Sequence, residues 1–190
     1  MKKIKVILMT ILLAGFMSCS DDSTGPGEAD TDLSRGTSSF SVTGDIEADH
    51  DGVAWYVGLR SEGGNFINLS LTVSDSEFDE QGDNDFNLSI RFVGSEEPFE
   101  LATGEYPIGA GNNVAVLPTY SNSIISDGTL VYSASPETSG SVRILSVTDT
   151  SIEASFNFTI QAGANREGES VTISGEINAE CLTADIGFGC

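Results

Sequence analysis

Apolar and polar residues alternate with a period of two through much of this chain, and no segment after residue 19 shows the 3.6-residue spacing of an amphipathic helix. Successive side chains of a β-strand point to opposite faces, so this alternation predicts strands with one buried face and one solvated face. Four segments show the pattern clearly, at 67–73, 86–92, 152–160 and 171–177. Weaker strands are predicted at 40–46, 53–59, 99–103, 114–120, 130–134 and 142–147.

Glycine, aspartate and serine separate most of these runs, as expected of turns between short strands. Roughly ten short strands with little or no helix predict an all-β domain, either an antiparallel β-sandwich or an up-and-down barrel. Both architectures bury one face of each strand, so the alternation does not choose between them.

The first residues have the character of an export signal. Three lysines lie within the first five residues, an apolar run follows at 6–16, and Ser18 and Cys19 come shortly after it. That run is too short to span a bilayer, which takes ~20 apolar residues. The arrangement resembles the lipobox of bacterial lipoproteins. The resemblance implies that 1–18 is a signal peptide and that Cys19 carries an acyl chain such as palmitate, which anchors the protein to the membrane.

Residues 19–38 contain almost nothing that could form a core and are rich in serine, threonine, aspartate and glycine. We interpret them as a flexible acidic linker between the anchor and a domain at 39–190. Cys181 and Cys190 close a short segment at the end of that domain. In an exported protein such a pair predicts a structural disulfide.

Charge excludes some partners. All three lysines precede Cys19, and the chain beyond it carries five arginines against 29 acidic residues, a net of −24. A charge of that sign repels nucleic acid, so we expect no nucleic-acid partner. The acids either keep the protein soluble or adapt it to high salt, where screening weakens their mutual repulsion.

Four motifs recur along the predicted strands: G-x-Y at 104–106, SG-x-V-x-I at 139–144, F-x-F at 156–158 and V-x-I at 171–173. Together they resemble a group of small Gram-negative bacterial lipoproteins of uncharacterised function. Two positions depart from the group, because Ala154 replaces a glycine and Ile177 replaces an aromatic residue. The resemblance implies a single all-β domain and a lipoprotein, and it transfers no catalytic residue.

Three candidate sites follow from residue type. His50, the only histidine, lies between two aspartates, but no nucleophile motif accompanies it, and we expect it in a surface loop. Trp55 has the parity of the apolar residues on its strand, so we expect Trp55 in the core and Tyr56 outside. The acidic loop at 75–85 has oxygen ligands suited to calcium, although it is not an EF-hand and a solvated hairpin loop is favoured. Its candidate ligands are Asp75, Glu77, Asp79, Asp83 and Asp85.

These patterns indicate a lipid-anchored lipoprotein of the outer membrane or cell surface that acts as a non-catalytic binding or interaction module. Its expected partners are the membrane, through Cys19, and other envelope proteins, a glycan or a small ligand. No cofactor is expected apart from the calcium considered above. Two alternatives stay open: a barrel-type carrier of a small apolar ligand, and a weak hydrolase that uses carboxylates near His50.

Overall fold

The computed structural model describes residues 36–60, 63–64, 66–75, 86–94, 99–110, 113–122, 130–163 and 168–182. All of them belong to one compact unit, Leu33–Cys190. These residues form strands and turns without any helix, which confirms the all-β prediction. Among them, no helix is long and apolar enough to cross a membrane. The signal segment and most of the linker lie outside the described residues.

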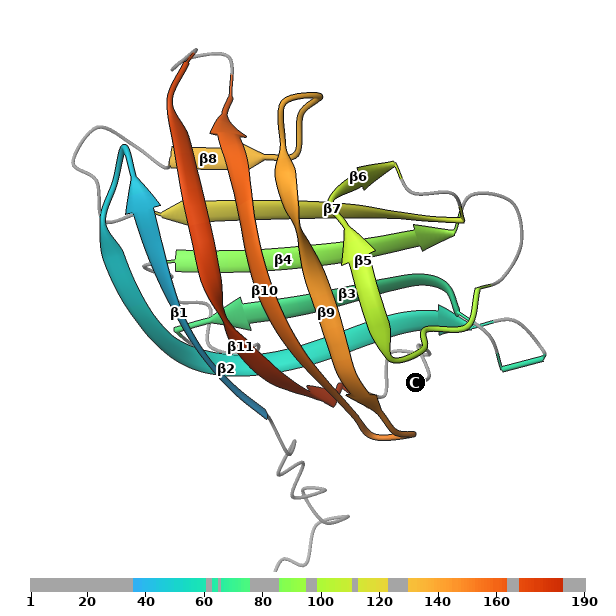
Figure 1. The fold of residues 1–190 in the computed structure, drawn as a ribbon. Coiled ribbons are helices and arrows are strands. Elements are labelled where there is room, and N and C mark those ends of the chain that lie inside the picture. The colour runs from blue at the N-terminus through green and yellow to red at the C-terminus, as the bar shows by residue number, and fades with distance from the viewer. Residues whose placement is uncertain are drawn as a thin grey trace, which may run out of the picture. The chain divides into compact units, whose positions relative to one another are not determined.

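Eleven strands are described, and the first begins within the segment that we had interpreted as linker (Figure 1). Gly36, Thr37 and Ser38 are part of this strand and pair with its neighbours. The strands are β1 (Gly36–Gly44), β2 (Ala48–Arg60), β3 (Phe66–Ser74), β4 (Phe86–Gly94), β5 (Gly104–Pro107), β6 (Gly109–Ala110), β7 (Val114–Asn122), β8 (Leu130–Ser133), β9 (Ser139–Val147), β10 (Ser151–Ala162) and β11 (Ser170–Cys181).

The strands close into a ring that follows chain order. Antiparallel pairing runs from β1 to β2, β3, β4, β7, β8, β10 and β11, and β11 pairs again with β1. This is the pattern of an up-and-down barrel. Three strands lie beside the ring: β9 pairs with β10, β5 pairs with β9, and β6 pairs with β7.

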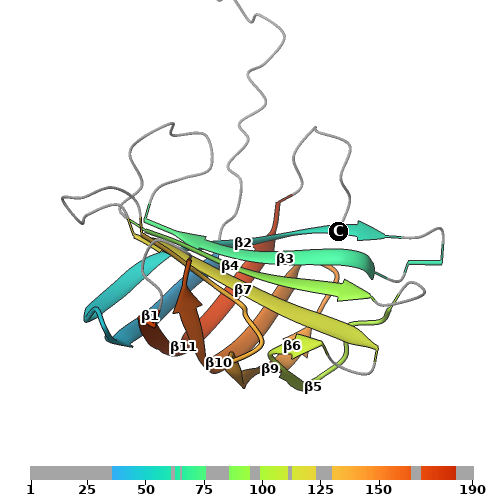
Figure 2. The same ribbon diagram turned by 90° about the horizontal axis from the view of Figure 1, so that it is seen from above.

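The barrel is flattened into two layers whose strands cross (Figures 1 and 2). One layer contains β2, β3, β4 and β7, and the other contains β1, β11, β10, β9 and β5. Strand β2 belongs to both, because it pairs with β1 over 48–54 and with β3 over 53–60. Gly52 lies where these two pairings meet. A Cβ added there would lie 2.4 Å from the carbonyl oxygen of Ser74, so the change of layer requires glycine.

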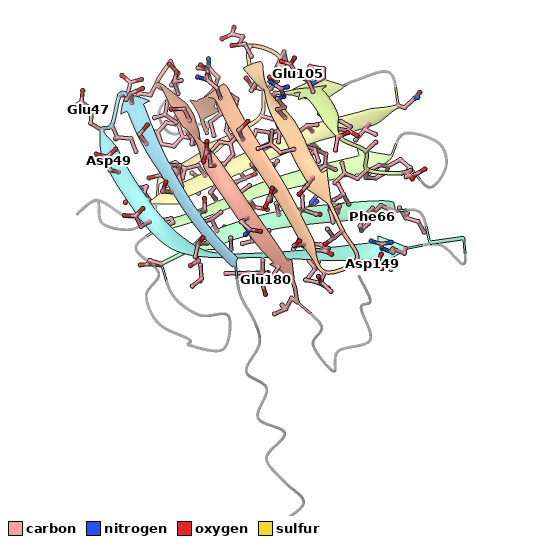
Figure 3. All side chains as sticks on the ribbon, turned by 60° about the horizontal axis from the view of Figure 1, so that its bottom comes forward. Glu47, Asp49, Phe66, Glu105, Asp149 and Glu180 are labelled. Atoms are coloured by element: carbon pink, nitrogen blue, oxygen red, sulfur yellow. The ribbon has the colours of Figure 1, made fainter. Side chains whose placement is uncertain are left out.

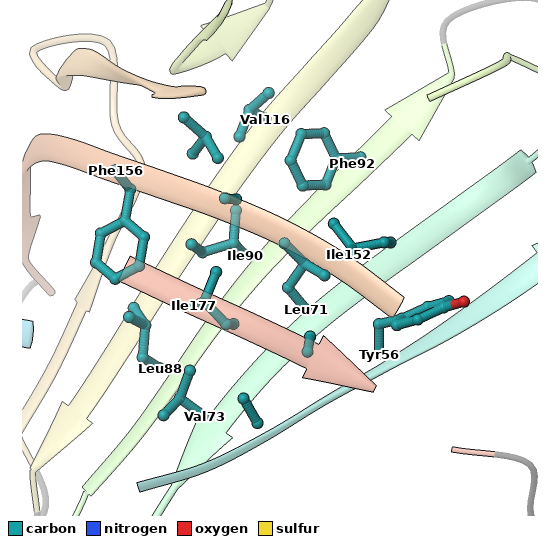
Figure 4. Close-up of a cluster of buried hydrophobic side chains, with 14 of the residues drawn as sticks. Tyr56, Leu71, Val73, Leu88, Ile90, Phe92, Val116, Ile152, Phe156 and Ile177 are labelled. Carbon is teal, nitrogen blue, oxygen red and sulfur yellow. The ribbon is translucent and has the colours of Figure 1, made fainter. Parts of the chain in front are cut away.

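The predicted alternation accounts for most of the core, which fills the space between the layers (Figure 4). In 86–92 and in 152–160, every apolar residue of the alternating set is buried. The inward residues of β3, β4, β10 and β11 form one continuous cluster with Tyr56, Val116 and Tyr120. The strands with the clearest sequence pattern therefore build the interior.

Two β-bulges explain the exposed apolar residues Ile67 and Leu145. In β3 the pairing with β2 skips Ile67, which is 43% exposed while Phe66 is buried. In β9 the pairing with β10 skips Leu145, which is 47% exposed while Ile144 is buried. An extra residue in one strand reverses the facing of the residues beyond it. The prediction that Ile67 faces the core is therefore wrong.

Two further predictions are wrong. The prediction that Tyr56 lies outside is wrong, because Tyr56 pairs with the inward residue Leu71 and is fully buried. Trp55 faces the other side of β2, although it too is only 7% exposed. Both faces of β2 carry apolar residues here, so the alternation of apolar and polar residues does not show which face of the strand points into the barrel. The predicted strand at 99–103 also does not form, since Phe99 makes only a single bridge to Phe66.

We predict that Gly175→Ala destabilises the domain by about 2 kcal/mol or more, as expected of an overpacked core. Gly175 lies on β11 between Phe40 and Phe156. A Cβ added to it would lie 2.3 Å from the carbonyl oxygen of Ser39. Urea unfolding of the full chain in detergent measures the effect. The control is Gly163→Ala, whose added Cβ has 3.7 Å of space, and an equal loss in both variants would contradict the prediction.

Salt dependence tests the two interpretations of the acidic surface. If the net charge of −24 limits stability, the urea midpoint of unfolding should rise steeply with added sodium chloride, because screening weakens repulsion between carboxylates. Potassium chloride should have the same effect at equal ionic strength. A midpoint that is flat between 0.05 and about 1 M salt would leave the acids a role in solubility only.

Candidate functional site

His50 lies inside the barrel and not in a surface loop, so the expectation for this residue is wrong. It is part of β2 and is 8% exposed. Its Nε2 lies 2.8 Å from the hydroxyl of Tyr120 on β7, which also accepts a hydrogen bond from Asn122 Nδ2 at 3.0 Å. We call His50, Tyr120 and Asn122 the histidine network. All three side chains are buried.

Aromatic rings enclose the histidine network. The imidazole of His50 lies 4.1 Å from the ring of Phe86 and 5.0 Å from the ring of Phe40, measured between centroids. Tyr120 packs edge-on to Phe40 at 6.2 Å and lies 6.3 Å from the ring of Tyr132. A hydrogen bond in such apolar surroundings is stronger than in water, because solvent does not compete for it.

The alternation of β2 separates His50 from its flanking aspartates. Asp49 and Asp51 are exposed, whereas His50 pairs across the sheet with the inward residue Phe40. Successive residues of a strand point to opposite faces. The Asp-His-Asp sequence therefore does not bring a carboxylate and an imidazole together through these neighbours. Sequence reasoning missed Tyr120 and Asn122, which are 70 and 72 positions away along the chain, and only strand pairing places them beside His50.

Burial raises the pKa of the Tyr120 hydroxyl, since the phenolate would lose its hydration. The hydrogen bond from Asn122 opposes this shift, and the nearby hydroxyl of Tyr132 adds to it. Tyr120 is thus held as a neutral phenol that can donate and accept hydrogen bonds. This arrangement suits a structural network that orients side chains in the core.

Only the beginning of the candidate calcium loop lies within the described residues. Asp75 is exposed, and its Oδ1 accepts a hydrogen bond from the Ser74 hydroxyl at 3.3 Å. Among the described residues, no group of three or more histidine, cysteine, aspartate or glutamate side chains could hold a metal ion. The other candidate ligands, Glu77, Asp79, Asp83 and Asp85, lie outside the described residues, and the calcium site stays a prediction.

The cysteines are placed only in part. Cys181 is buried at the end of β11, where the Cys181 backbone N–H donates to the carbonyl of Thr150. Cys190 and Cys19 lie outside the described residues. The disulfide and the acylated cysteine therefore stay predictions.

The outer face of β1, β2 and β11 is polar and carries two shallow hollows, of about 560 and 370 Å³. Ser39, Asp51 and Glu176 line both, and these three residues are cross-strand neighbours. Side chains on this face bond to one another across the strands, as the hydroxyls of Ser41 and Ser174 do at 3.2 Å. Exposed carboxylates lie at both ends of the described strands (Figure 3).

We predict that Tyr120→Phe lowers the free energy of unfolding at pH 8 by about 1–3 kcal/mol, because one hydroxyl serves both His50 and Asn122. It should also weaken the loss of stability at alkaline pH. Unfolded tyrosine ionises near pH 10, whereas the folded pKa of Tyr120 is raised. The folded state then binds more protons, so its stability is complete below about pH 10 and falls as pH rises further.

Urea unfolding followed by circular dichroism between about pH 8 and 11.5 checks this dependence. Tyr56→Phe serves as the comparison, since burial also raises the pKa of Tyr56 and its hydroxyl belongs to a different part of the core. Each variant should remove part of the alkaline decline. If the free energy of unfolding of Tyr120→Phe fell as steeply with rising pH as that of the unaltered chain, ionisation of the Tyr120 hydroxyl would not be a cause of the alkaline loss of stability.

Comparison with known proteins gives no relative for this chain. No protein-family model matches it, no curated protein matches it, and no solved structure matches it. The site is therefore argued from the geometry of the chain alone.

Proposed function

We propose that this chain is a lipid-anchored cell-envelope lipoprotein whose β domain is a non-catalytic binding module. The position of His50 is the observation that supports a non-catalytic function. The only histidine of the chain is enclosed by aromatic rings and bonded to a tyrosine whose pKa burial raises. A general base must reach the proton that it removes. His50 borders the hollow of 370 Å³ but is only 8% exposed, and its Nε2 is already hydrogen-bonded to Tyr120.

The anchor rests on the sequence. A basic and apolar leader ends at Cys19, and an acidic linker of some 16 residues separates that cysteine from β1. Linkers of such composition and length have an end-to-end distance on the order of 20 Å in general, which would suit a spacer between an anchor and a domain. In this proposal the anchored protein lies at the outer membrane or at the cell surface.

The packed interior supports recognition at the surface over carriage of an internal ligand. Large side chains from both layers meet in one cluster, and Tyr56, Phe92 and Phe158 are fully or almost fully buried in it. The hollows described above lie on the outer faces of the strands. A partner such as an envelope protein, a glycan or a small ligand would thus meet the outside of the barrel.

The anchor is tested by Cys19→Ser in the full chain, expressed in a Gram-negative host with an alkyne-tagged fatty acid. We expect the unaltered protein to incorporate the label and to sediment with membranes, and Cys19→Ser to lose both properties. Cys181→Ser is the matched control, since it removes a cysteine and leaves the anchor in place. Labelling of Cys19→Ser equal to that of the unaltered chain would contradict the proposal.

The non-catalytic role is tested separately. The purified chain and His50→Gln are compared on glycoside, ester and peptide substrates. We expect no turnover above background from either. Hydrolysis by the unaltered chain that His50→Gln abolishes would establish a hydrolase and overturn the proposed role.

A further inference from the structure

A small hollow lies at one end of the barrel, where β2 ends and β3 begins, beside the turn between β9 and β10. It encloses about 200 Å³. We call it the Arg60 hollow, and the residues used below are Arg60, Phe66, Glu100, Leu101, Val147 and Asp149. Phe66 and Asp149 mark its position in Figure 3, next to each other at the lower right of the sheet.

Arg60 is fixed in this hollow by two contacts. Its Cζ lies 4.1 Å from the centre of the Phe66 ring, and its Nη1 donates a hydrogen bond of 3.0 Å to the carbonyl of Gly64. Stacking on an aromatic ring holds the guanidinium in one plane. The direction in which its remaining N–H groups point is therefore set by the fold.

Two of the three nitrogens of that guanidinium are not available to a ligand. Nη1 is bonded to Gly64, and Nε is inaccessible to solvent, without a hydrogen-bond partner among the residues that the structure describes. Nη2 is therefore the group through which Arg60, as a lining residue of the hollow, can donate hydrogen bonds to a carboxylate.

The other walls of the hollow are mixed in character. Phe66 and Leu101 are buried, and Val147 is partly buried against the core, so they form an apolar surface. Glu100 and Asp149 are exposed at its margin and carry negative charge. A simple anion would meet one guanidinium and two carboxylates, which is electrostatically unfavourable. A molecule that bears an ammonium group as well as a carboxylate would complement both.

We propose that the Arg60 hollow binds a small zwitterion, an α-amino acid with an aliphatic side chain. The carboxylate accepts hydrogen bonds from Arg60, the ammonium group lies against Glu100 or Asp149, and the side chain packs on Phe66, Leu101 and Val147. A hollow of this volume has room for a ligand of that size and not for an extended polymer. The inference rests on the proposed function and deepens it by naming a ligand class.

The test is isothermal titration of the full chain in detergent with L-leucine, with 4-methylpentanoate, which lacks the amino group, and with 3-methylbutylamine, which lacks the carboxylate. We expect leucine to bind with a Kd of about 1 mM or tighter, and each analogue to bind at least about tenfold more weakly. Absence of leucine binding at ten times that concentration would overturn the proposal. Equal binding of 4-methylpentanoate would do so too, because it would make the ammonium group irrelevant.

Variants of the lining residues locate the site, with Arg143→Gln as their control. Arg60→Gln should weaken leucine binding at least about tenfold, whereas Arg143→Gln, which removes an exposed arginine from β9, should leave it unchanged. Because Arg60 packs on Phe66, circular dichroism of Arg60→Gln first establishes that the variant is folded. Glu100→Gln and Asp149→Asn each change only an exposed side chain, and the variant that removes the carboxylate beside the ammonium group should weaken the binding of leucine but not of 4-methylpentanoate. Unchanged binding in Arg60→Gln would place the ligand elsewhere and overturn the proposal. The labelling of Cys19 is independent of these results, so failure here is distinguishable from failure of the anchor.

Discussion

The closure of the sheet on itself depends on β2. This strand is shared by both layers, and without it the ring would open into a sheet that runs from β3 through β7, β8 and β10 to β1, with free edges at β3 and β1. Its turn from one layer to the other occurs at Gly52, where the backbone of β3 approaches too closely for any side chain. Orthogonal corners of this kind rely on glycine or on bulges, because an ordinary residue would clash. The buried position of His50 and the direction of Tyr56 both follow from the course of this one strand.

The sequence alone predicts the parts of the fold that obey a simple period. Strands β4, β10 and β11 alternate cleanly, and their inward residues form the core as expected. Prediction fails where a bulge interrupts the alternation of apolar and polar residues, or where residues on both faces of a strand are apolar. The bulge at Ile67 shifts the register of β3, and the residues around Trp55 are apolar on both faces of β2. Bulges depend on the pairing of distant strands, which local alternation does not contain.

The candidate site was less predictable than the fold for a related reason. The neighbours of His50 along the chain suggested carboxylates, whereas its neighbours in space are aromatic rings and a tyrosine hydroxyl. The Arg60 hollow joins the end of β2 and the start of β3 to the turn before β10, which lies about 80 positions further along the chain. The lone histidine between two aspartates was a local signal for the first of these sites, and no local signal pointed to the second. The histidine does not identify its partners without the closed barrel.

The sheet that carries β9 ends at β5, which among the described strands pairs only with β9. This edge strand is four residues long, carries the exposed carboxylate of Glu105 and ends at Pro107, which has no N–H to donate. Short length, charge and proline are the devices by which soluble proteins keep a free edge from pairing with a neighbour. With the anchor proposed above, molecules tethered to one membrane would share a surface layer and meet edge to edge far more often than in dilute solution. The chemistry of β5 would let this domain crowd at such a surface without polymerising through its sheets.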